Sequence, residues 1–346
     1  MPDQAAPDPA PAAARKIDRN VYALSAVSFF TDASSEMIYP LLPIFLTTTL
    51  GASAGALGII EGAAETTAAL LKLASGWWSD RVRRRKPLIV AGYTIASAVR
   101  PLIAIAQTAT QVLGIRLIDR VGKGIRGAPR DALIADSVDV SIRGKAFGIQ
   151  RASDHAGAVV GPLVAFAVLT WWHTPLRTVF WLAAIPGAIA VAIALFVVRE
   201  KPHPVTAPGE TIDPSVPLPR RFWGALGAVT LFTLGNSTDA FLLLRATELG
   251  VPIALAPVLW AMLHVVKSST STPGGILSDR VGRKPAVIAG WMIYAGVYLL
   301  FARATEAWHA WALFALYGIY FGLAEGPERA LVADVVPGGR RGTAYG

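Results

Sequence analysis

Apolar runs of about 20 residues recur along this chain, and its charged residues are gathered in short clusters between them. Hydrophobic residues make up 53% of the 346 positions and charged residues 16%, whereas an ordinary soluble domain has roughly 25% charged residues. A helix of this length crosses the hydrocarbon core of a bilayer and satisfies its backbone hydrogen bonds internally. The pattern therefore predicts an all-α polytopic membrane protein.

We expect ten membrane-spanning helices from these runs. They lie near residues 21–47, 54–79, 87–107, 110–136, 146–171, 178–198, 223–244, 253–277, 285–302 and 308–334. The proline-rich stretch "REKPHPVTAPGETIDPSVPLPRR" after the sixth run predicts an aqueous linker. The expected organisation is a disordered tail at 1–18, a six-helix half at 19–198, a linker at 199–222 and a four-helix half at 223–346.

Lysine and arginine gather in the loops on one side of this predicted topology. These loops hold residues 81–86 and 280–284, Arg143 with Lys145, Arg199 with Lys201, Arg220 with Arg221, and Arg340 with Arg341. Positively charged short loops stay in the cytoplasm, so both ends of the chain are expected there. Anionic lipid headgroups account for the net charge of +9, and no nucleic-acid partner is needed.

Three short phrases occur twice at nearly one period. "SDRV" occurs at 79–82 and 278–281, "ALIAD" at 132–136 recurs as "ALVAD" at 330–334, and "RGKAFG" at 143–148 recurs as "RGTAYG" at 341–346. Each copy stands at the same place relative to a predicted span. This recurrence predicts a duplicated membrane unit of the kind found in secondary transporters.

These phrases resemble the signature of the major facilitator superfamily between its second and third helices, Gly-x-x-x-Asp-Arg-x-Gly-Arg-Arg/Lys. The first copy consists of Gly76, Asp80, Arg81, Arg84 and Arg85, with Arg83 where glycine is usual. The second copy consists of Gly275, Asp279, Arg280, Gly282, Arg283 and Lys284. The resemblance extends from near residue 20 to the end of the chain, and it implies two pseudo-symmetric helical halves.

Both signatures are expected to act as a conformational latch. Asp80 is predicted at a helix end, where a carboxylate accepts backbone N–H groups or pairs with arginine. Gly76, one turn earlier, allows another helix to approach closely. Alternatively, the cations at 83–86 only set the membrane topology, to which an acid such as Asp80 contributes little.

A row of cations marks one face of the fourth predicted span. Its members are spaced by three or four residues: Arg116, Arg120, Lys123, Arg126 or Gly127, and Arg130. Charge at this depth is costly in lipid, so the face is expected to meet water, an acid or substrate. In the superfamily, Arg120-x-x-x-Gly124 matches a fourth-helix motif linked to proton transfer, although Lys123 replaces the common glutamine. Arg116 and Arg130 are alternatively interfacial residues whose side chains reach the headgroups.

Small residues and a proline mark the fifth predicted span. Their spacing resembles the superfamily's antiporter signature and involves Gly148, Gly157, Gly161 and Pro162, with Ala165 and Phe166 in place of the usual closing Gly-Gly pair. The signature implies a kinked, closely packed helix and favours efflux over uptake. A purely structural helix contact would look similar.

Membrane-embedded acids are the candidate proton carriers. Asp32 and Glu36 lie four residues apart, as do Glu61 and Glu65, so each pair shares a helix face. Neighbouring carboxylates in a low dielectric repel each other, which favours holding a proton. Alternatively, they neutralise nearby arginines as fixed ion pairs. Family resemblance implies that spans one, four, seven and ten line the cavity, and the full set of candidates for the substrate and proton pathway is Asp32, Glu36, Glu61, Glu65, Arg120, Lys123, Asp154, Asn236, Asp239 and Glu325.

Catalytic motifs are absent from the sequence: it has no Gly-x4-Gly-Lys-Ser/Thr phosphate loop, nucleophile elbow, HExxH site or cysteine. We therefore expect no enzyme activity, cofactor or resident metal. The resemblance implies a monomeric transporter of the bacterial inner membrane that exports a small solute by alternating access, with the proton gradient as coupling source. One alternative is a heavy-metal-ion export permease, which "FFTDASSEMIYPLLPIFL" resembles loosely. The other is a transport-inactive membrane scaffold or fragment.

The phrase at 341–346 carries a further expectation. It corresponds to the opening of the fifth helix in the first half, so two more helices are expected beyond Gly346. In the superfamily the latch around Asp80 faces the eleventh helix, and the latch around Asp279 faces the fifth. We therefore expect Asp279 to have its partner and Asp80 to lack one.

Overall fold

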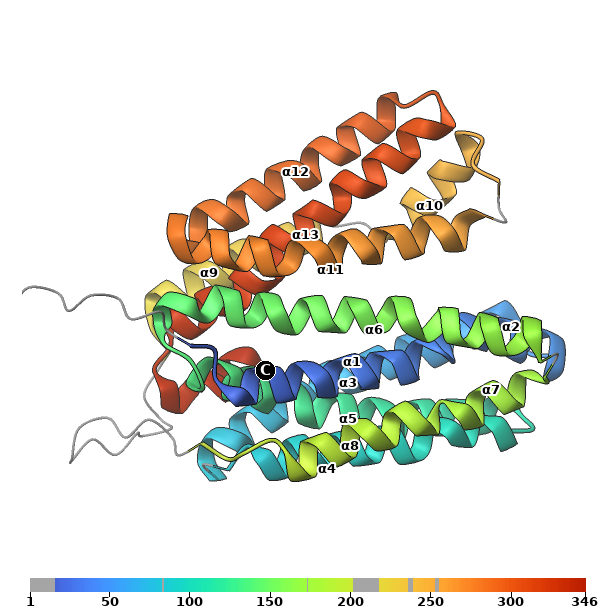
Figure 1. The fold of residues 1–346 in the computed structure, drawn as a ribbon, viewed down its shortest axis with the longest axis horizontal. Coiled ribbons are helices and arrows are strands. Elements are labelled where there is room, and N and C mark those ends of the chain that lie inside the picture. Colours follow the sequence, from blue (N-terminus) through green and yellow to red (C-terminus); the bar gives the residue numbers. More distant parts are fainter. Residues whose placement is uncertain (1–15, 83, 173, 202–217, 236–238, 253–254) are drawn as a thin grey trace, which may run out of the picture.

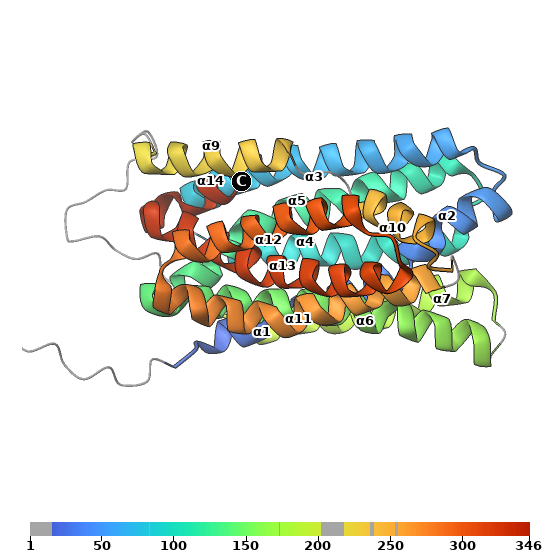
Figure 2. The same ribbon diagram turned by 90° about the horizontal axis from the view of Figure 1, so that it is seen from above.

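The computed structural model describes residues 16–82, 84–172, 174–201, 218–235, 239–252 and 255–346. Long helices lie side by side in one bundle, with α11, α12 and α13 along one side and the helices of the first half along the other (Figures 1 and 2). The described residues contain helices and no strand. The predicted all-α fold class is thus confirmed.

The described part of the first half contains six long helical segments. They are built from α1 (Arg19–Glu36), η1 (Tyr39–Leu41), α2 (Leu42–Ile44), η2 (Phe45–Thr49), α3 (Ala54–Val82), α4 (Lys86–Val99), η3 (Arg100–Ile105), α5 (Ala109–Asp136), η4 (Val140–Ile142), α6 (Arg143–Trp171), α7 (Leu176–Leu182) and α8 (Ala184–Phe196). Prolines break the regular pattern of two of them, because a proline has no N–H to donate. Pro40 and Pro43 follow α1, and Pro101 follows α4 at the start of η3.

The second half begins inside the predicted linker. It contains α9 (Arg220–Leu234), α10 (Asp239–Glu248), α11 (Ala256–Val281), α12 (Arg283–Arg303), α13 (Ala307–Val335), η6 (Gly338–Arg340) and α14 (Arg341–Tyr345). The predicted span at 223–244 is therefore not continuous: α9 ends where the Gly235 N–H bonds back to the carbonyls of Leu231 and Phe232, at a residue of low helix propensity. Most of the predicted tail and linker lies outside the described residues.

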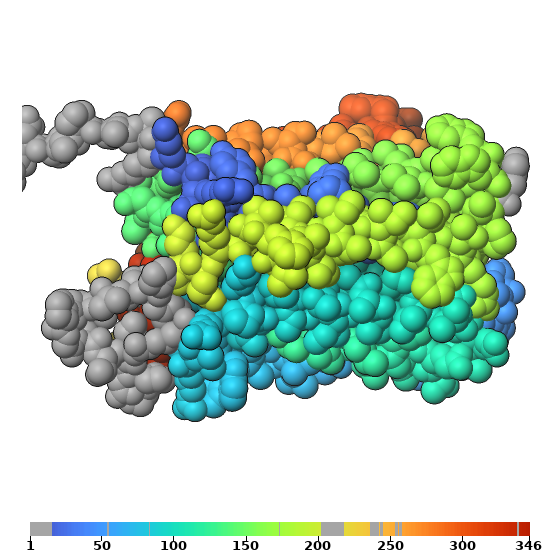
Figure 3. All heavy atoms as spheres, turned by 60° about the horizontal axis from the view of Figure 1, so that its bottom comes forward, coloured from blue at the N-terminus to red at the C-terminus, as the bar shows by residue number. Residues whose placement is uncertain are grey.

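Five helical segments of the described chain are long and apolar enough to cross a membrane. They are Lys86–Ile105, Val140–Trp171, Leu176–Phe196, Arg283–Arg303 and Ala307–Val335. Each coincides with a predicted span. The other predicted spans contain more charged or polar residues, as in α1, α3, α5 and α11, or are broken, as between α9 and α10. Figure 3 shows the outer face on which two of the apolar segments, α4 and α8, lie beside each other.

The cationic loops gather at one end of the bundle, which we call the basic end. It carries the α3–α4, α5–α6 and α11–α12 turns, the start of α9, and α14 near the end of the chain (Figures 1 and 2). We call the opposite end the far end. It carries the α1–α3, α6–α7 and α12–α13 connections.

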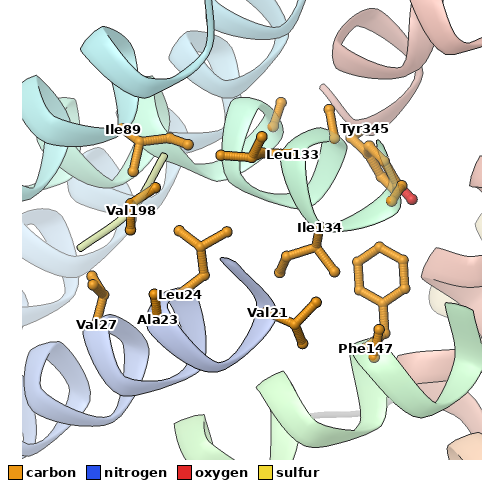
Figure 4. Close-up of a cluster of buried hydrophobic side chains, with 14 of the residues drawn as sticks. Val21, Ala23, Leu24, Val27, Ile89, Leu133, Ile134, Phe147, Val198 and Tyr345 are labelled. Atoms are coloured by element: carbon orange, nitrogen blue, oxygen red, sulfur yellow. The ribbon is translucent and has the colours of Figure 1, made fainter. Parts of the chain in front are cut away.

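Three apolar cores among the described residues hold the bundle together. The core at the basic end joins both halves, because Val21, Leu133 and Phe147 pack in one cluster with Ala330 and Tyr345 (Figure 4). The other two cores lie toward the far end, and each stays within one half: one spans residues 37–183 and the other residues 242–324. In the described chain, the halves therefore share a buried apolar core at the basic end only.

Candidate functional site

Asp279, at the end of α11, accepts hydrogen bonds from the first turn of α6. Its carboxylate oxygens receive the backbone N–H groups of Gly144 at 2.9 Å and of Lys145 at 2.7 Å. Arg283 binds the same carboxylate from the α11–α12 turn. An acid at a helix N-terminus satisfies free N–H groups and complements the helix dipole. Asp279 thereby ties the second half to the first.

Asp80, at the end of α3, makes the equivalent contact with α14. Its carboxylate accepts the N–H of Gly342 at 2.9 Å, the N–H of Thr343 at 2.6 Å and the Thr343 hydroxyl at 2.7 Å. The expectation that Asp80 lacks a partner is wrong, because the helical turn Arg341–Tyr345 already supplies the N–H groups. Both aspartates therefore reach across to the opposite half, each from its own.

Two further aspartates complete this contact, and the sequence reasoning did not assign them a role. Asp136 pairs with Arg85 from its own half and with Arg341 from the other. Asp334 pairs with Arg283 at 3.1 Å and with Arg143 across the halves at 2.6 Å. Asp136 and Asp334 close the repeated "ALIAD" and "ALVAD" phrases, and Arg143 and Arg341 open the repeated "RGKAFG" and "RGTAYG" phrases. The repeat could have identified them, since a charge kept in both copies needs a reason.

Glycines allow the halves to approach at the same level. A Cβ at Gly76 would collide with the Gly342 carbonyl oxygen, and one at Gly275 would collide with that of Gly144. Among the remaining signature residues, Arg81 stacks on the Trp77 ring at 3.7 Å. Arg84 and Arg280 are exposed, and Arg83 lies outside the described residues.

The small residues of α6 face two different neighbours. A Cβ at Gly148 would strike the backbone of Ser271 in the second half, while Gly157 and Gly161 pack against the backbone of α1. Pro162 lies inside α6. The predicted antiporter signature thus places α6 between its own half and the other half, with contacts at backbone distance on both sides.

The acids of α3 pair with cations of α5. Glu61 lies 2.6 Å from the Arg116 guanidinium, and Glu65 lies 3.1 Å from Arg120 and 3.5 Å from Lys123. This arrangement agrees with the ion-pair alternative for these two glutamates.

A buried ion pair that the sequence reasoning did not anticipate lies beside them. Asp119 accepts Arg100 at 2.9 Å and the Tyr39 hydroxyl at 2.8 Å, and all but a few per cent of both charged side chains is buried. Its only sequence signal is an acid within a row of cations.

Asp32 and Glu36 differ from the other acids of the first half. Neither side chain makes a hydrogen bond or an ion pair with another described residue. Both lie on the inner part of α1, where Asp32 is half-buried and Glu36 likewise. They are carboxylates in the bundle interior without a fixed cation among the described residues.

Two deeper ion pairs also join the halves. Asp131 on α5 is fully buried and pairs with Arg329 on α13. His155 on α6 lies 3.0 Å from Glu325 on α13, and its ring contacts that of His264 on α11 at 5.4 Å. These contacts reach the middle of α6, beyond which the cores of the two halves are separate.

The remaining pathway candidates are scattered. Asp154 bonds to Gln150 and pairs with Arg151 at 2.9 Å on its own helix. Asn236 lies outside the described residues, and Asp239 is described only as the first residue of α10. In the part of the chain that the structure describes, no three His, Cys, Asp or Glu side chains form a metal-binding group.

The geometry is that of a two-part gate. Reciprocal aspartate contacts and one shared core close the basic end, while separate cores hold the halves at the far end. Charge-assisted bonds to helix N-termini can be broken as units without unfolding either half. Such an arrangement supports rocking of the halves about a central region.

Comparisons with known proteins agree with this architecture. The family model described as the Major Facilitator Superfamily matches residues 24–346. An uncharacterized MFS-type transporter of Methanocaldococcus jannaschii is 34% identical over 338 residues, which cover 96% of this chain and 84% of the relative. The inner membrane transport protein YajR of Escherichia coli is 25% identical over 324 residues, covering 90% and 69% of the two chains.

Solved structures give the same fold. The Escherichia coli fucose:proton symporter FucP, in its outward conformation, superposes with a TM-score of 0.73 at 15% sequence identity, covering 94% of this chain and 87% of FucP. The multidrug resistance protein MdtG of Proteus mirabilis is 30% identical over 193 residues, or 54% of this chain and 47% of the relative. With a family model across nearly its whole length and a relative 34% identical, this chain belongs to the major facilitator superfamily.

Proposed function

We propose that this protein is a proton-coupled exporter of a small solute that works by alternating access in the bacterial inner membrane. The observation that carries the proposal is the asymmetry of the two ends: the basic end is closed by reciprocal contacts between the halves, and the far end has none of that shared core among the described residues. The positive-inside rule assigns the basic end to the cytoplasm. Both described termini then face the cytoplasm, and the gate described above is the cytoplasmic gate.

Proton coupling is supported by the acids of α1. Asp32 and Glu36 have no fixed cation among the described residues, whereas Glu61, Glu65 and Asp119 do. An unpaired carboxylate away from bulk water changes its protonation readily when its surroundings change from one conformation to the other. We therefore assign proton binding to Asp32 and Glu36. The monomer is the proposed unit.

Export is supported by the small-residue spacing of α6 and by the similarity to MdtG, which is named a multidrug resistance protein. The inner-membrane location is supported by the similarity to YajR. The metal-ion alternative has no described cluster of ligands in its favour. A small organic solute is therefore the proposed substrate.

Flux measurements in proteoliposomes test this function. The full chain is reconstituted with an imposed pH gradient and offered a panel of cationic, anionic and neutral organic solutes together with divalent metal ions. We expect a pH gradient to drive at least one organic solute against its concentration gradient, and we expect Asp32→Asn with Glu36→Gln to abolish that coupling. Flux of metal ions alone would favour the metal-export alternative. Folded protein without flux of any solute would contradict the proposal.

A further inference from the structure

The α3–α4 turn is one residue longer than its counterpart between α11 and α12. Asp80 and Arg85 play the same parts as Asp279 and Arg283, yet the first pair encloses "RVRR" and the second encloses "RVG". The additional residue is a cation. Arg84 is exposed and makes no hydrogen bond or ion pair with another described residue. The gate therefore leaves Arg84 without a task.

Arg84 stands at the mouth of a groove between α4 and α8. The groove has a volume of about 940 Å³. Beyond its mouth it is lined by Pro87, Val90, Ala91, Thr94, Ile95 and Leu195. Figure 3 shows α4 and α8 side by side on this outer face, with the residues of the α3–α4 turn at the basic end. A cationic mouth thus opens into a nearly apolar channel.

Both walls of the groove belong to segments that are expected to contact lipid. α4 and α8 lie in two of the apolar spans, Lys86–Ile105 and Leu176–Phe196, and Leu195 is 45% exposed. Trp77 and Trp78 are exposed near the same end of α3, and tryptophan is enriched where a membrane meets water. The mouth therefore lies at headgroup level and the channel at acyl-chain level.

The other charges at the mouth already have partners. The Lys86 ammonium donates to the Leu195 carbonyl at 2.8 Å and joins α4 to α8. Glu200 accepts the N–H groups of Arg85 at 3.0 Å and Lys86 at 2.9 Å, so its charge complements the start of α4. Arg84 remains as the exposed cation of the groove, and a guanidinium binds phosphate oxygens in a bidentate manner.

We propose that the α4–α8 groove binds an anionic phospholipid of the leaflet at the basic end. Arg84 binds the phosphate diester, the Lys86 ammonium contributes a second positive charge, and one acyl chain lies along α4 toward Ile95. Residues 86–95 of α4 span roughly 15 Å at 1.5 Å per residue, which accommodates most of an extended acyl chain. A free phosphate ion would leave this apolar channel unused.

Lipid selectivity of the purified full chain tests the proposal. Native mass spectrometry is run with equal amounts of phosphatidylglycerol and phosphatidylcholine that carry identical acyl chains. We expect the wild-type chain to retain phosphatidylglycerol preferentially. Arg84→Ala should lower the affinity for phosphatidylglycerol about five-fold, the effect of one cation at a membrane surface, and leave phosphatidylcholine binding unchanged.

Arg280→Ala is the matched control. Arg280 is an exposed arginine of the second copy at the same end, so its removal changes the net charge equally without touching the groove. We expect its lipid preference to equal that of the wild type. If Arg84→Ala keeps the wild-type preference, or if Arg280→Ala loses as much, the cations act only through the general surface charge and the proposal fails.

Two further measurements separate the sources of binding. Ala91→Leu narrows the channel and should lower retention of both lipids, because it removes space for the acyl chain. Inorganic phosphate at millimolar concentration should not displace the bound lipid. Displacement by phosphate, or unchanged retention in Ala91→Leu, would overturn the assignment of the groove to a phospholipid.

Discussion

The Asp80 carboxylate accepts the backbone N–H of Gly342 at 2.9 Å, although 262 residues separate them in the sequence. Asp279 accepts the N–H of Gly144 at the same distance. Each half therefore contributes one aspartate that binds the start of a helix in the other half. Because the contacts are reciprocal, loss of one leaves the second in place.

Replacement of either aspartate by asparagine should loosen the basic end. Asp80→Asn removes the charge that binds two N–H groups, and a hydrogen bond to a charged group contributes about 1.5–3 kcal/mol. Distances between spin labels at Val82→Cys and Val281→Cys, both exposed at this end, should shift to longer values, more so in Asp80→Asn with Asp279→Asn. The chain has no native cysteine to interfere. Unchanged distance distributions in all three variants would contradict the gate.

The same substitution should slow transport much more than it lowers protein yield. Asparagine leaves the positive charges of the α3–α4 turn in place, so the topology signal is kept. The comparison is solute flux per folded protein in proteoliposomes, for wild type and Asp80→Asn. Equal flux at equal protein would show that the Asp80 contact does not limit the transport cycle.

Gly275→Ala should destabilise the contact between α6 and α11. The new methyl group would collide with the Gly144 carbonyl oxygen, and overpacking of this kind costs roughly 1–3 kcal/mol. Gly296→Ala on α12 is the control, because no atom lies within 4 Å of the place that its Cβ would take and alanine favours helix by about 1 kcal/mol. Thermal unfolding in detergent should fall for the first variant only. Identical unfolding temperatures would argue against the close helix contact.

Asp136→Asn should destabilise the protein more than Asp334→Asn. The two aspartates make equivalent contacts, but the Asp136 side chain is 3% exposed and that of Asp334 is 21% exposed. Removing one partner of a buried ion pair costs about 3–5 kcal/mol, and exposure to water reduces that cost. Thermal unfolding of the two variants checks the order. The reverse order would mean that burial does not decide the strength of these pairs.

Asp32→Asn and Asp119→Asn should separate coupling from folding. Asp32 has no fixed cation among the described residues, so its replacement should change stability little and remove the pH dependence of transport. Asp119→Asn leaves the buried Arg100 without its charged partner, which should lower the yield of folded protein. Stability and pH-dependent flux are measured on both. Normal pH dependence in Asp32→Asn would assign the proton to another acid, with Glu36→Gln as the next variant.

The sequence alone determined the class of the protein, most of its helices and the two gate aspartates. Apolar runs long enough to span a bilayer force a helix wherever they occur, because lipid offers the backbone no other hydrogen-bond partner. The repeat then predicted that Asp80 and Asp279 have equivalent places. These inferences depend only on neighbouring residues and on the comparison of two copies. Pro40, Pro43 and Gly235 explain locally where the helices depart from the predicted spans.

Tertiary structure alone decided which charges meet. Asp136 bonds to Arg341, and Asp131 to Arg329, across about 200 residues, and nothing in the local sequence distinguishes these acids from Asp32. Whether a carboxylate in a membrane protein is a fixed ion-pair partner or a free one depends on the cation that the packing of another helix brings within about 4 Å. That distance is set by the crossing of helices far apart in the chain, so only the folded bundle reveals it.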